Sequence, residues 1–259
     1  MKQFFISDLH LSDKRPDLIR AFVSLSDEIL ANESPCELYI LGDFFEAYIG
    51  DDYQPEWMLT LDKQLIRLTA AGVNVFFIAG NRDFLVGQDW FERTGITELN
   101  ERHQLTHKHA SLVLTHGDEF CVDDQPYQDF RAMVRKPAWQ QQVLAMPLEQ
   151  RVALAQKLRD DSKSMSADKS EAIMDVNQQA IIESVPTNTD LLIHGHTHRP
   201  ALHGHEAVTR LVLGDWDQQV WLAELSDGQM TQSRIDTAEY LATKTPYSQW
   251  TSEHIIDLA

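Results

Sequence analysis

The chain is poor in cysteine and in long apolar runs. Its two cysteines, Cys36 and Cys121, form no CxxC pair, so we expect a reducing compartment and no disulfide framework. No apolar run approaches the roughly 18 residues that a transmembrane helix needs. The N-terminal segment MKQFFISDLH reaches the charged Asp8 without the apolar core of a signal peptide. Together these absences favour a cytosolic protein.

Basic charge is scarce as well. The 259 residues include 22 Lys and Arg against 40 Asp and Glu, which gives a formal net charge of −18 at pH 7. Proteins that coat nucleic acid need basic surface to neutralise phosphates, so we expect no nucleic-acid partner. The length suffices for one substantial α/β domain with an inserted subdomain.

Five short segments rich in Asp, Asn and His each follow an apolar run. The segments are Asp8-Leu9-His10, Gly42-Asp43, Gly80-Asn81-Arg82-Asp83, His116-Gly117-Asp118 and Gly195-His196-Thr197-His198. The apolar runs that precede them are residues 2–7, 37–42, 73–79, 111–115 and 190–194. Continuous apolarity is typical of strands that are buried on both faces.

The spacing of the first three runs predicts a parallel sheet. Amphipathic stretches at 17–31 and 54–71 are long enough for crossover helices, and a β-α-β-α-β order implies parallel strands. The C-terminal ends of such strands lie at the edge where open α/β sheets place their active sites. Residues 207–214 and 219–225 are predicted to form a hairpin that extends a second sheet, which would give a layered sandwich. The polar tail 229–259 receives no predicted role.

The five segments supply the donors of a two-metal hydrolase. The predicted metal ligands are Asp8, His10, Asp43, Asn81, His116, His196 and His198. Asp43 is the natural bridging carboxylate, because its two oxygens can hold two ions about 3.5–4 Å apart. Mixed nitrogen and oxygen donors suit Mn, Fe, Ni or Zn better than Ca or Mg, so we expect two divalent ions, with Mn²⁺ as first choice. Such a site predicts hydrolysis of a phosphoester or phosphoanhydride.

Residues 123–185 are predicted to form an inserted helical cap between two parts of a core, 1–122 and 186–259. They contain no strand-like run, and Pro137 and Pro147 divide them into short helices. Eight Lys and Arg within 127–171 outnumber six Asp and Glu, a local charge of +2 in an acidic chain. A basic, apolar insertion favours a substrate cap, while an ordinary helical excursion with solvated charges is the alternative.

The ordered set of segments resembles the calcineurin-like metallophosphoesterase superfamily, whose pattern is DxH, GD, GNH(D/E), H and GHxH. The resemblance implies an α/β fold of the αββα sandwich type. Arg82 stands where the superfamily usually has a His that acts as general acid toward an alkoxide. Arginine donates no proton at useful pH, so we expect a leaving group that needs none. A phosphate monoester released from a pyrophosphate fits, and the planar fork of Arg82 suits phosphate binding.

Longer runs resemble the UDP-2,3-diacylglucosamine diphosphatase family of lipid A biosynthesis. These runs are LYILGDFFEAYIGDD, FFIAGNRDFLVG, DD-x-x-YQ-x-F-R at 123–131, S-x-x-x-S-x-x-K-S-x-x-IMDVNQ at 162–178, and HGHTHRP. The resemblance covers residues 1 to about 225, insertion included. It implies hydrolysis of UDP-2,3-bis(3-hydroxyacyl)glucosamine to UMP and 2,3-diacylglucosamine 1-phosphate, by attack of water on the α-phosphorus. It also implies peripheral attachment to the cytoplasmic face of the inner membrane.

The same resemblance assigns roles to individual residues. One metal would be held by Asp8, His10, Asp43 and His198, and the other by Asp43, Asn81, His116 and His196. The catalytic group would be Asp43, Asn81, Arg82, His116 and His196. The implied substrate contacts are Asn81, Arg82, Asp124, Tyr127, Phe130, Arg159, Ser162, Ser166, Lys169 and His196. Ser166 stands where the family often has Asn, and its hydroxyl can still form hydrogen bonds.

The insertion also has a physical interpretation that does not depend on the family. An acylated sugar needs an apolar chamber beside a phosphate site, and the predicted helices of the insertion carry apolar side chains that could line one. Ordinary packing of these helices in a core would explain the same apolar periodicity. Their basic residues would suit an anionic membrane surface. Two other functions remain open at this point: a different dinuclear metallophosphoesterase, such as a phosphodiesterase or phosphatase, or a non-catalytic scaffold of the same fold.

Overall fold

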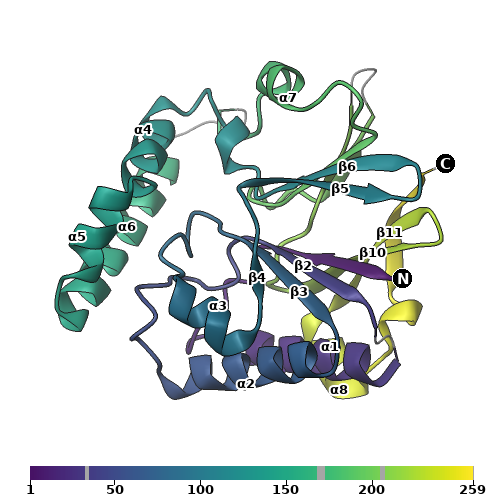
Figure 1. Cartoon of the computed structure of the whole chain (residues 1–259), viewed down its shortest axis with the longest axis horizontal. Helices are drawn as coiled ribbons and strands as arrows, with labels where there is room; N and C mark the ends of the chain where they lie inside the picture. The colour runs from purple at the N-terminus through teal and green to yellow at the C-terminus, as the bar shows by residue number, and fades with distance from the viewer. Residues whose placement is uncertain (33–34, 168–172, 205–207, 259) are drawn as a thin grey trace.

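The structure, a computed structural model, describes residues 1–32, 35–167, 173–204 and 208–258. Two β-sheets lie face to face, with helices outside each of them and a further group of helices at one end (Figure 1). The predicted αββα sandwich is therefore confirmed, and so is the parallel arrangement of the first three strands.

The larger sheet has seven strands in the order β12-β11-β10-β1-β2-β3-β4. Its parallel part consists of β1 (Gln3–Ile6), β2 (Glu37–Leu41), β3 (Asn74–Ile78) and β4 (Thr97–Glu98). Its antiparallel part consists of β10 (Gln219–Ser226), β11 (Gln229–Asp236) and β12 (Thr251–Asp257). The first three strands lie within one or two residues of the predicted apolar runs.

The smaller sheet has five strands in the order β5-β6-β7-β9-β8. They are β5 (Arg102–His107), β6 (Ala110–Thr115), β7 (Leu191–His194), β8 (Ala201–His203) and β9 (Thr209–Val212). The strands β6, β7 and β9 are parallel to one another. Both sheets therefore contain parallel strands. The C-terminal ends of the parallel strands in one sheet can lie next to those in the other sheet.

Each layer of the sandwich has its own core. Helices α1 (Pro16–Asn32), α2 (Glu56–Ala70), α3 (Gln88–Thr94) and α8 (Thr237–Thr243) cover the outer face of the large sheet (Figure 1). The two sheets pack on each other through buried side chains such as Phe5, Leu41, Leu114 and Ile193. On the far side, α7 (Gln178–Ser184) packs on the small sheet through Ile181.

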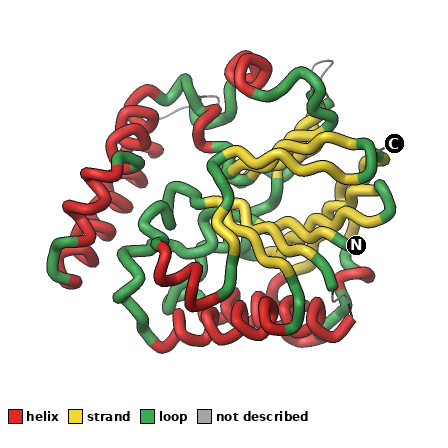
Figure 2. Tube along the Cα trace, viewed as in Figure 1, coloured by secondary structure: helices red, strands yellow, loops and turns green. Residues whose placement is uncertain are grey.

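Three helices stand apart from the sandwich, as the tube view shows (Figure 2). They are α4 (Gln125–Val134), α5 (Pro137–Leu144) and α6 (Leu148–Ala167), and Pro137 and Pro147 lie at the starts of the last two as predicted. The predicted insertion 123–185 also contains α7, which packs on the sandwich and not on these helices. Among the described helices, none is long and apolar enough to cross a membrane.

The predicted hairpin of 207–214 with 219–225 is wrong. Strand β9 belongs to the small sheet and pairs with β7 and β8, whereas β10 belongs to the large sheet and pairs with β1. The true hairpin joins β10 to β11 through Asp227 and Gly228, which both have positive φ and suit a tight turn between twisted strands. Gly214 is buried and does not lie at an exposed turn. A Cβ at this position would lie 2.2 Å from the ring of Trp221.

The tail of unassigned role forms one edge of the large sheet. Its aromatic side chains Tyr240, Tyr247 and Trp250 are buried in the core under that sheet. Gln232, on β11, is buried and donates a hydrogen bond to the carbonyl of Val212 at 3.1 Å. The polar sequence concealed a strand because its side chains alternate between a buried and an exposed face.

Candidate dinuclear metal centre

All five ligand segments follow strands whose C-terminal ends meet at one place. Asp8 and His10 follow β1, Asp43 follows β2, and Asn81 follows β3 in the large sheet. His116 follows β6, and the His196–His198 segment follows β7 in the small sheet. Two sheets that face each other thus bring together side chains up to 190 positions apart in the sequence, for example the rings of His10 and His198.

The backbone is strained where these side chains leave the strands. Five of the predicted ligands have positive φ: Asp8 (55°), His10 (48°), Asp43 (52°), His196 (67°) and His198 (54°). Residues other than glycine adopt this left-handed region at a free-energy cost, and such residues cluster at functional sites. The surrounding hydrogen bonds hold the strain, since Asp8 N donates to Gly42 O and His10 N to Asp43 O, both at 3.0 Å.

Two glycines allow the loops to approach each other. A Cβ on Gly80 would lie 2.2 Å from Asp43 Oδ1, and a Cβ on Gly42 would lie 2.5 Å from His116 Nδ1. Gly42 also has a φ of +87°. The glycines of the GD and GNRD segments are therefore needed because the ligands themselves occupy the space that a side chain would take.

One group of donors consists of Asp8, His10 and His198. The Nε2 atoms of His10 and His198 are 3.1 Å apart, and His198 Nε2 lies 3.4 Å from Asp8 Oδ1. Asp8 is fully buried, and its other oxygen accepts hydrogen bonds from Ser7 Oγ at 2.7 Å and His196 N at 2.9 Å. Burial alone would lower the pKa of His198, but the nearby negative charge of Asp8 raises it to about 9.

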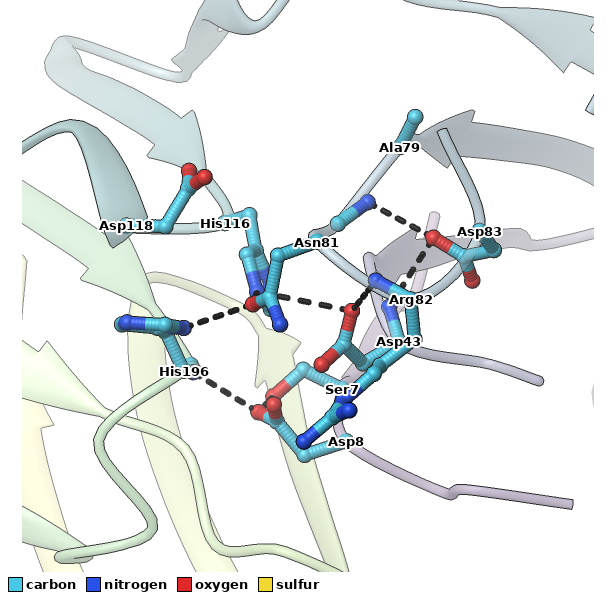
Figure 3. A network of polar contacts seen from close by, with 12 residues as sticks. Ser7, Asp8, Asp43, Ala79, Asn81, Arg82, Asp83, His116, Asp118 and His196 are labelled. Carbon is cyan, nitrogen blue, oxygen red and sulfur yellow. Dashed lines mark hydrogen bonds and ion pairs between the residues drawn. The ribbon is translucent and has the colours of Figure 1, made fainter. Parts of the chain in front are cut away.

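The second group consists of Asp43, Asn81, His116 and His196 (Figure 3). Asn81 Oδ1 lies 3.0 Å from His116 Nε2 and 2.8 Å from His196 Nδ1. His116 Nε2 also lies 3.6 Å from Asp43 Oδ1, which itself accepts a hydrogen bond from Arg82 N at 2.8 Å. Burial and the charge of His116 lower the pKa of His196 to about 4, so this ring is neutral at pH 7.

The donor atoms fit divalent metal ions. His116 Nδ1 must donate to the Leu41 carbonyl, 2.9 Å away, so in the neutral ring the Nε2 lone pair points at two oxygen acceptors. The buried Asp8 Oδ1 has no hydrogen-bond partner within the described residues. Lone pairs that face one another are repulsive unless a proton or a metal ion lies between them. Among the described residues, Asp8–His10–His198 and Asp8–Asp43–His116 converge closely enough to hold an ion.

Asp83 holds two ligand loops together. It is completely buried, and Oδ1 accepts from Gly80 N at 2.7 Å while Oδ2 accepts from Phe44 N at 2.7 Å. Asp43 N is a third donor, 3.3 Å from Oδ1 (Figure 3). Burial and the charge of Asp43 raise the pKa of Asp83 to about 6. One carboxylate thereby fixes the spacing between the Asp43 and Asn81 loops.

Asp118 links the centre to α4. Its buried Oδ2 accepts hydrogen bonds from Tyr127 Oη and from Arg131 Nε, each at 2.8 Å. Burial alone would raise the pKa of Asp118, but the charges of His116, Arg131 and Arg135 hold it below the ordinary range. Arg135 also donates to the carbonyls of Ala79 and Gly80, each at 3.0 Å. The first helix of the insertion is therefore fastened to the loop that carries Asn81.

His194, the last residue of β7, lies directly before the loop that carries His196 and His198. It is fully buried, its Nδ1 lies 2.8 Å from Gly195 O, and its Nε2 lies 3.1 Å from an Arg210 NH group. Burial and the charge of Arg210 lower the pKa of His194 to about 3, so the ring is neutral. Nε2 accepts from Arg210 and Nδ1 donates to Gly195 in that tautomer.

A cavity of about 260 Å³, named here the first cavity, lies between the centre and the insertion. Its walls include the predicted substrate contacts Asn81, Arg82, Asp124, Tyr127, Phe130, Arg159 and Ser162. His196 lies beside it, since its ring centroid is 5.5 Å from that of Tyr127. Lys169 and the side chain of Ser166 lie outside the described residues.

The apolar walls of the first cavity come from both regions of the chain. Trp139, Val143 and Leu154 come from the insertion, and Phe84 and Leu85 come from the core. Other apolar residues of the insertion do not line it: Met133, Leu144 and Leu148 are each 37–40% exposed. The predicted apolar chamber therefore exists, with a smaller set of lining residues.

Sequence reasoning missed several side chains around the centre. Glu46 Oε2 lies 3.2 Å from His10 Nδ1, and its other oxygen pairs with Arg159. Asp215 Oδ2 lies 3.5 Å from His198 Nδ1. The only sequence signal for Glu46 is its place three residues after a ligand, and Asp215 gave none, because it follows a strand without a motif. Histidine ligands commonly have such a carboxylate on the second ring nitrogen.

Comparison with known proteins agrees with this geometry. The family model "Calcineurin-like phosphoesterase" matches residues 1–200. Three curated relatives are called UDP-2,3-diacylglucosamine hydrolase. The one from Hahella chejuensis is 42% identical over 85% of this chain and 92% of its own length. That from Marinobacter nauticus is 41% identical (88% and 95%), and that from Haemophilus influenzae 43% identical (82% and 90%).

These matches span most of the chain and include every ligand segment described above. The identities are far above what a shared fold alone requires, and the coverage includes the insertion. The chain belongs to the calcineurin-like phosphoesterase family and, within it, groups with the UDP-2,3-diacylglucosamine hydrolases.

Proposed function

We propose that this enzyme hydrolyses the pyrophosphate of UDP-2,3-diacylglucosamine at the α-phosphorus, giving UMP and 2,3-diacylglucosamine 1-phosphate. One observation carries the proposal. Arg82 lines the cavities on both sides of the metal centre, and its Nε is buried without a hydrogen-bond partner among the described residues. A buried guanidinium donor at that junction favours a charged, bidentate acceptor such as a phosphate group.

The metal centre supplies the chemistry. Asp8, His10, Asp43 and His198 would hold one ion, and Asp43, Asn81, His116 and His196 the other, with Asp43 shared. When bound, two divalent ions supply a nucleophilic water at neutral pH and neutralise phosphoryl charge. The mixture of imidazole, carboxylate and amide donors favours Mn²⁺ over Mg²⁺.

The protein's own side chains position the substrate and the leaving group. Arg82 cannot act as a proton donor, and the sugar phosphate that leaves needs none at pH 7 because its second pKa is about 6. The Asn81 and His196 side chains, whose Oδ1 and Nδ1 atoms are 2.8 Å apart, would contact the phosphates. Asp124, Phe130, Arg159 and Ser162 would contact the glucosamine and its acyl chains from the insertion.

The division of labour between core and insertion belongs to the same proposal. The sandwich would bind metals, while α4–α6 would form the cap over the acylated sugar. The cap, as proposed here, is shorter than 123–185 because α7 packs on the small sheet. The acylated substrate resides in a bilayer, so we propose that the enzyme works at the cytoplasmic face of the inner membrane.

Isotope labelling tests the reaction. Purified enzyme is incubated with UDP-2,3-diacylglucosamine and Mn²⁺ in oxygen-18 water, and the products are analysed by mass spectrometry. Label in UMP is the expected result, since it marks attack at the α-phosphorus. Label in the sugar phosphate would contradict that site of attack, and no turnover would contradict the substrate.

An Arg82 series tests the observation that carries the proposal. Arg82→Met removes the fork and Arg82→Lys retains the charge only, so we expect turnover to fall at least about 100-fold and 10-fold respectively. Metal content should stay unchanged in both variants. The bond from Arg82 to the Asp43 carboxylate comes from the backbone N–H, which both substitutions retain. Equal activity of all three proteins would show that the side chain does not act on the substrate.

A further inference from the structure

Two cavities meet at the metal centre. The second cavity has a volume of about 670 Å³, within the usual range for small-molecule sites. It shares Glu46, Arg82 and Arg159 with the first cavity, and it alone is lined by the predicted ligands His10 and His198. A phosphoryl group at the metals therefore has an opening on each side, and a substrate with two arms can place one arm in each.

The walls of the two cavities differ in chemistry. The first cavity is mostly apolar. The second also has apolar lining, from residues such as Leu11, Leu18 and Val152, but it adds the polar turn Ser12–Arg15 after β1 and the Asp215–Asp217 segment between β9 and β10. The half-buried rings of Tyr53, just before α2, and Trp57, in its first turn, complete this wall. An acyl chain would leave these polar groups unpaired, so the second cavity favours the polar arm of a substrate.

The polar wall is held in place before any ligand binds. Arg15 donates to Asp217 Oδ1 at 2.5 Å and to the Asp217 carbonyl at 3.0 Å, and it also pairs with Asp17 at 2.9 Å. These bonds tie the turn after β1 to the loop before β10. Asp13 and Lys14 lie on the same turn and remain exposed to the cavity.

We propose that the second cavity is the nucleoside subsite, with the base against Tyr53 and Trp57 and the ribose beside the Ser12–Arg15 turn. This inference rests on the proposed function, which supplies a nucleotide as one half of the substrate. Aromatic side chains are the usual platform for a base. Ribose hydroxyls and the imide N–H of a pyrimidine are donors, and Asp13 and Asp215 offer carboxylate acceptors.

A pair of ligands that differ only in the base isolates this subsite from the metal site. UMP and ribose 5-phosphate share the phosphate, so the ratio of their dissociation constants reports the base alone. We expect UMP to bind the Mn²⁺-loaded protein about tenfold more tightly by calorimetry, as base stacking typically provides. In Tyr53→Ala and Trp57→Ala the ratio should fall toward one.

Two control variants change residues outside the second cavity. Lys63→Ala changes an exposed lysine farther along α2 that lines neither cavity, and Phe130→Ala changes the first cavity only. Both should leave the ratio unchanged. Trp57 is half-buried against Phe45, so where Trp57→Ala fails to fold, the ratio measured in Tyr53→Ala decides the test. A ratio that survives in Tyr53→Ala, or is lost in Phe130→Ala, would overturn the subsite.

Failure of this inference differs from failure of the proposed function. Turnover of UDP-2,3-diacylglucosamine together with an unchanged ratio in the variants would reject only the subsite. A ratio that depends on Tyr53 without turnover of that substrate would reject only the reaction.

Discussion

The metal centre and the insertion are held in place by different forces. Around the centre, buried carboxylates bind backbone N–H groups: Asp83 clamps two loops and Asp8 ties the β7 loop to β1. The insertion is instead attached through side chains, by apolar contacts such as that of Trp139 with Phe84 and by arginine pairs at Asp118, at Glu46 and at Asp52. Bonds from a short carboxylate to backbone N–H groups hold the loops directly, whereas the arginines reach across with long side chains that have more rotamers.

This difference matches two tasks. Metal ions need donors at fixed distances, and an acylated substrate needs an apolar cavity beside them. Four of the eight basic residues counted in the insertion, Arg131, Arg135, Arg151 and Arg159, pair with acidic residues of the core. Their charge therefore serves attachment to the core, a use that the sequence alone did not indicate.

The largest expected effect comes from removing the shared carboxylate. Asp43→Ala should abolish both metal binding and turnover, because Asp43 is the carboxylate that we propose to be shared by the two ions. Metal content measured by mass spectrometry and hydrolysis of UDP-2,3-diacylglucosamine check this. Asp89→Ala, an exposed aspartate on α3, is the matched control and should bind metal normally. Full activity of Asp43→Ala would contradict the bridging role.

Next in size is the loop clamp. Asp83→Asn keeps the shape but exchanges one acceptor oxygen for a donor, so at least one of the N–H groups of Gly80 and Phe44 loses its partner. Residues that orient metal ligands typically contribute 10–100-fold in metal affinity, and we expect a loss in that range. Titration with Mn²⁺ measures it. Unchanged affinity with reduced thermal stability would mean that the clamp matters for folding alone.

A smaller effect should follow from detaching α4. Arg135→Met removes the donor to the Ala79 and Gly80 carbonyls next to Asn81, and we expect kcat to fall about tenfold with the metal content intact. Arg135→Lys retains the charge near Glu101 without the fork and should recover part of the rate. A change confined to KM would place Arg135 in substrate binding instead of loop positioning.

The smallest effect should come from detaching α6. Arg151 donates to the Ile49 carbonyl at 2.6 Å and to Asp52 Oδ1 at 2.7 Å, far from the metal donors. Arg151→Met should raise KM for the acylated substrate several-fold and leave kcat and metal affinity unchanged. Lys157→Met, at an exposed position of the same helix, is the control. Loss of metal from Arg151→Met would show that the two regions are not independent.

Sequence patterns predicted the catalytic sandwich more fully than its edges. The first three strands, their crossover helices and the convergence of the ligand segments followed from apolar runs that end in Asp, Asn or His. The pairing of β10 with β1 and β11 did not, because a short connection between two apolar runs does not reveal that they lie in different sheets. The burial of Gln232 and Trp250 was equally hidden in a polar tail.

By itself, the sequence predicted the donor set, the order of the first parallel strands and the unusual place of Arg82, since each is a local pattern of residue types. Only the tertiary structure decided which carboxylates clamp the loops, which arginines attach the insertion, and that two cavities of different polarity open onto one centre. Those features depend on contacts between segments that are distant in the chain. Their geometry arises when the two sheets pack face to face.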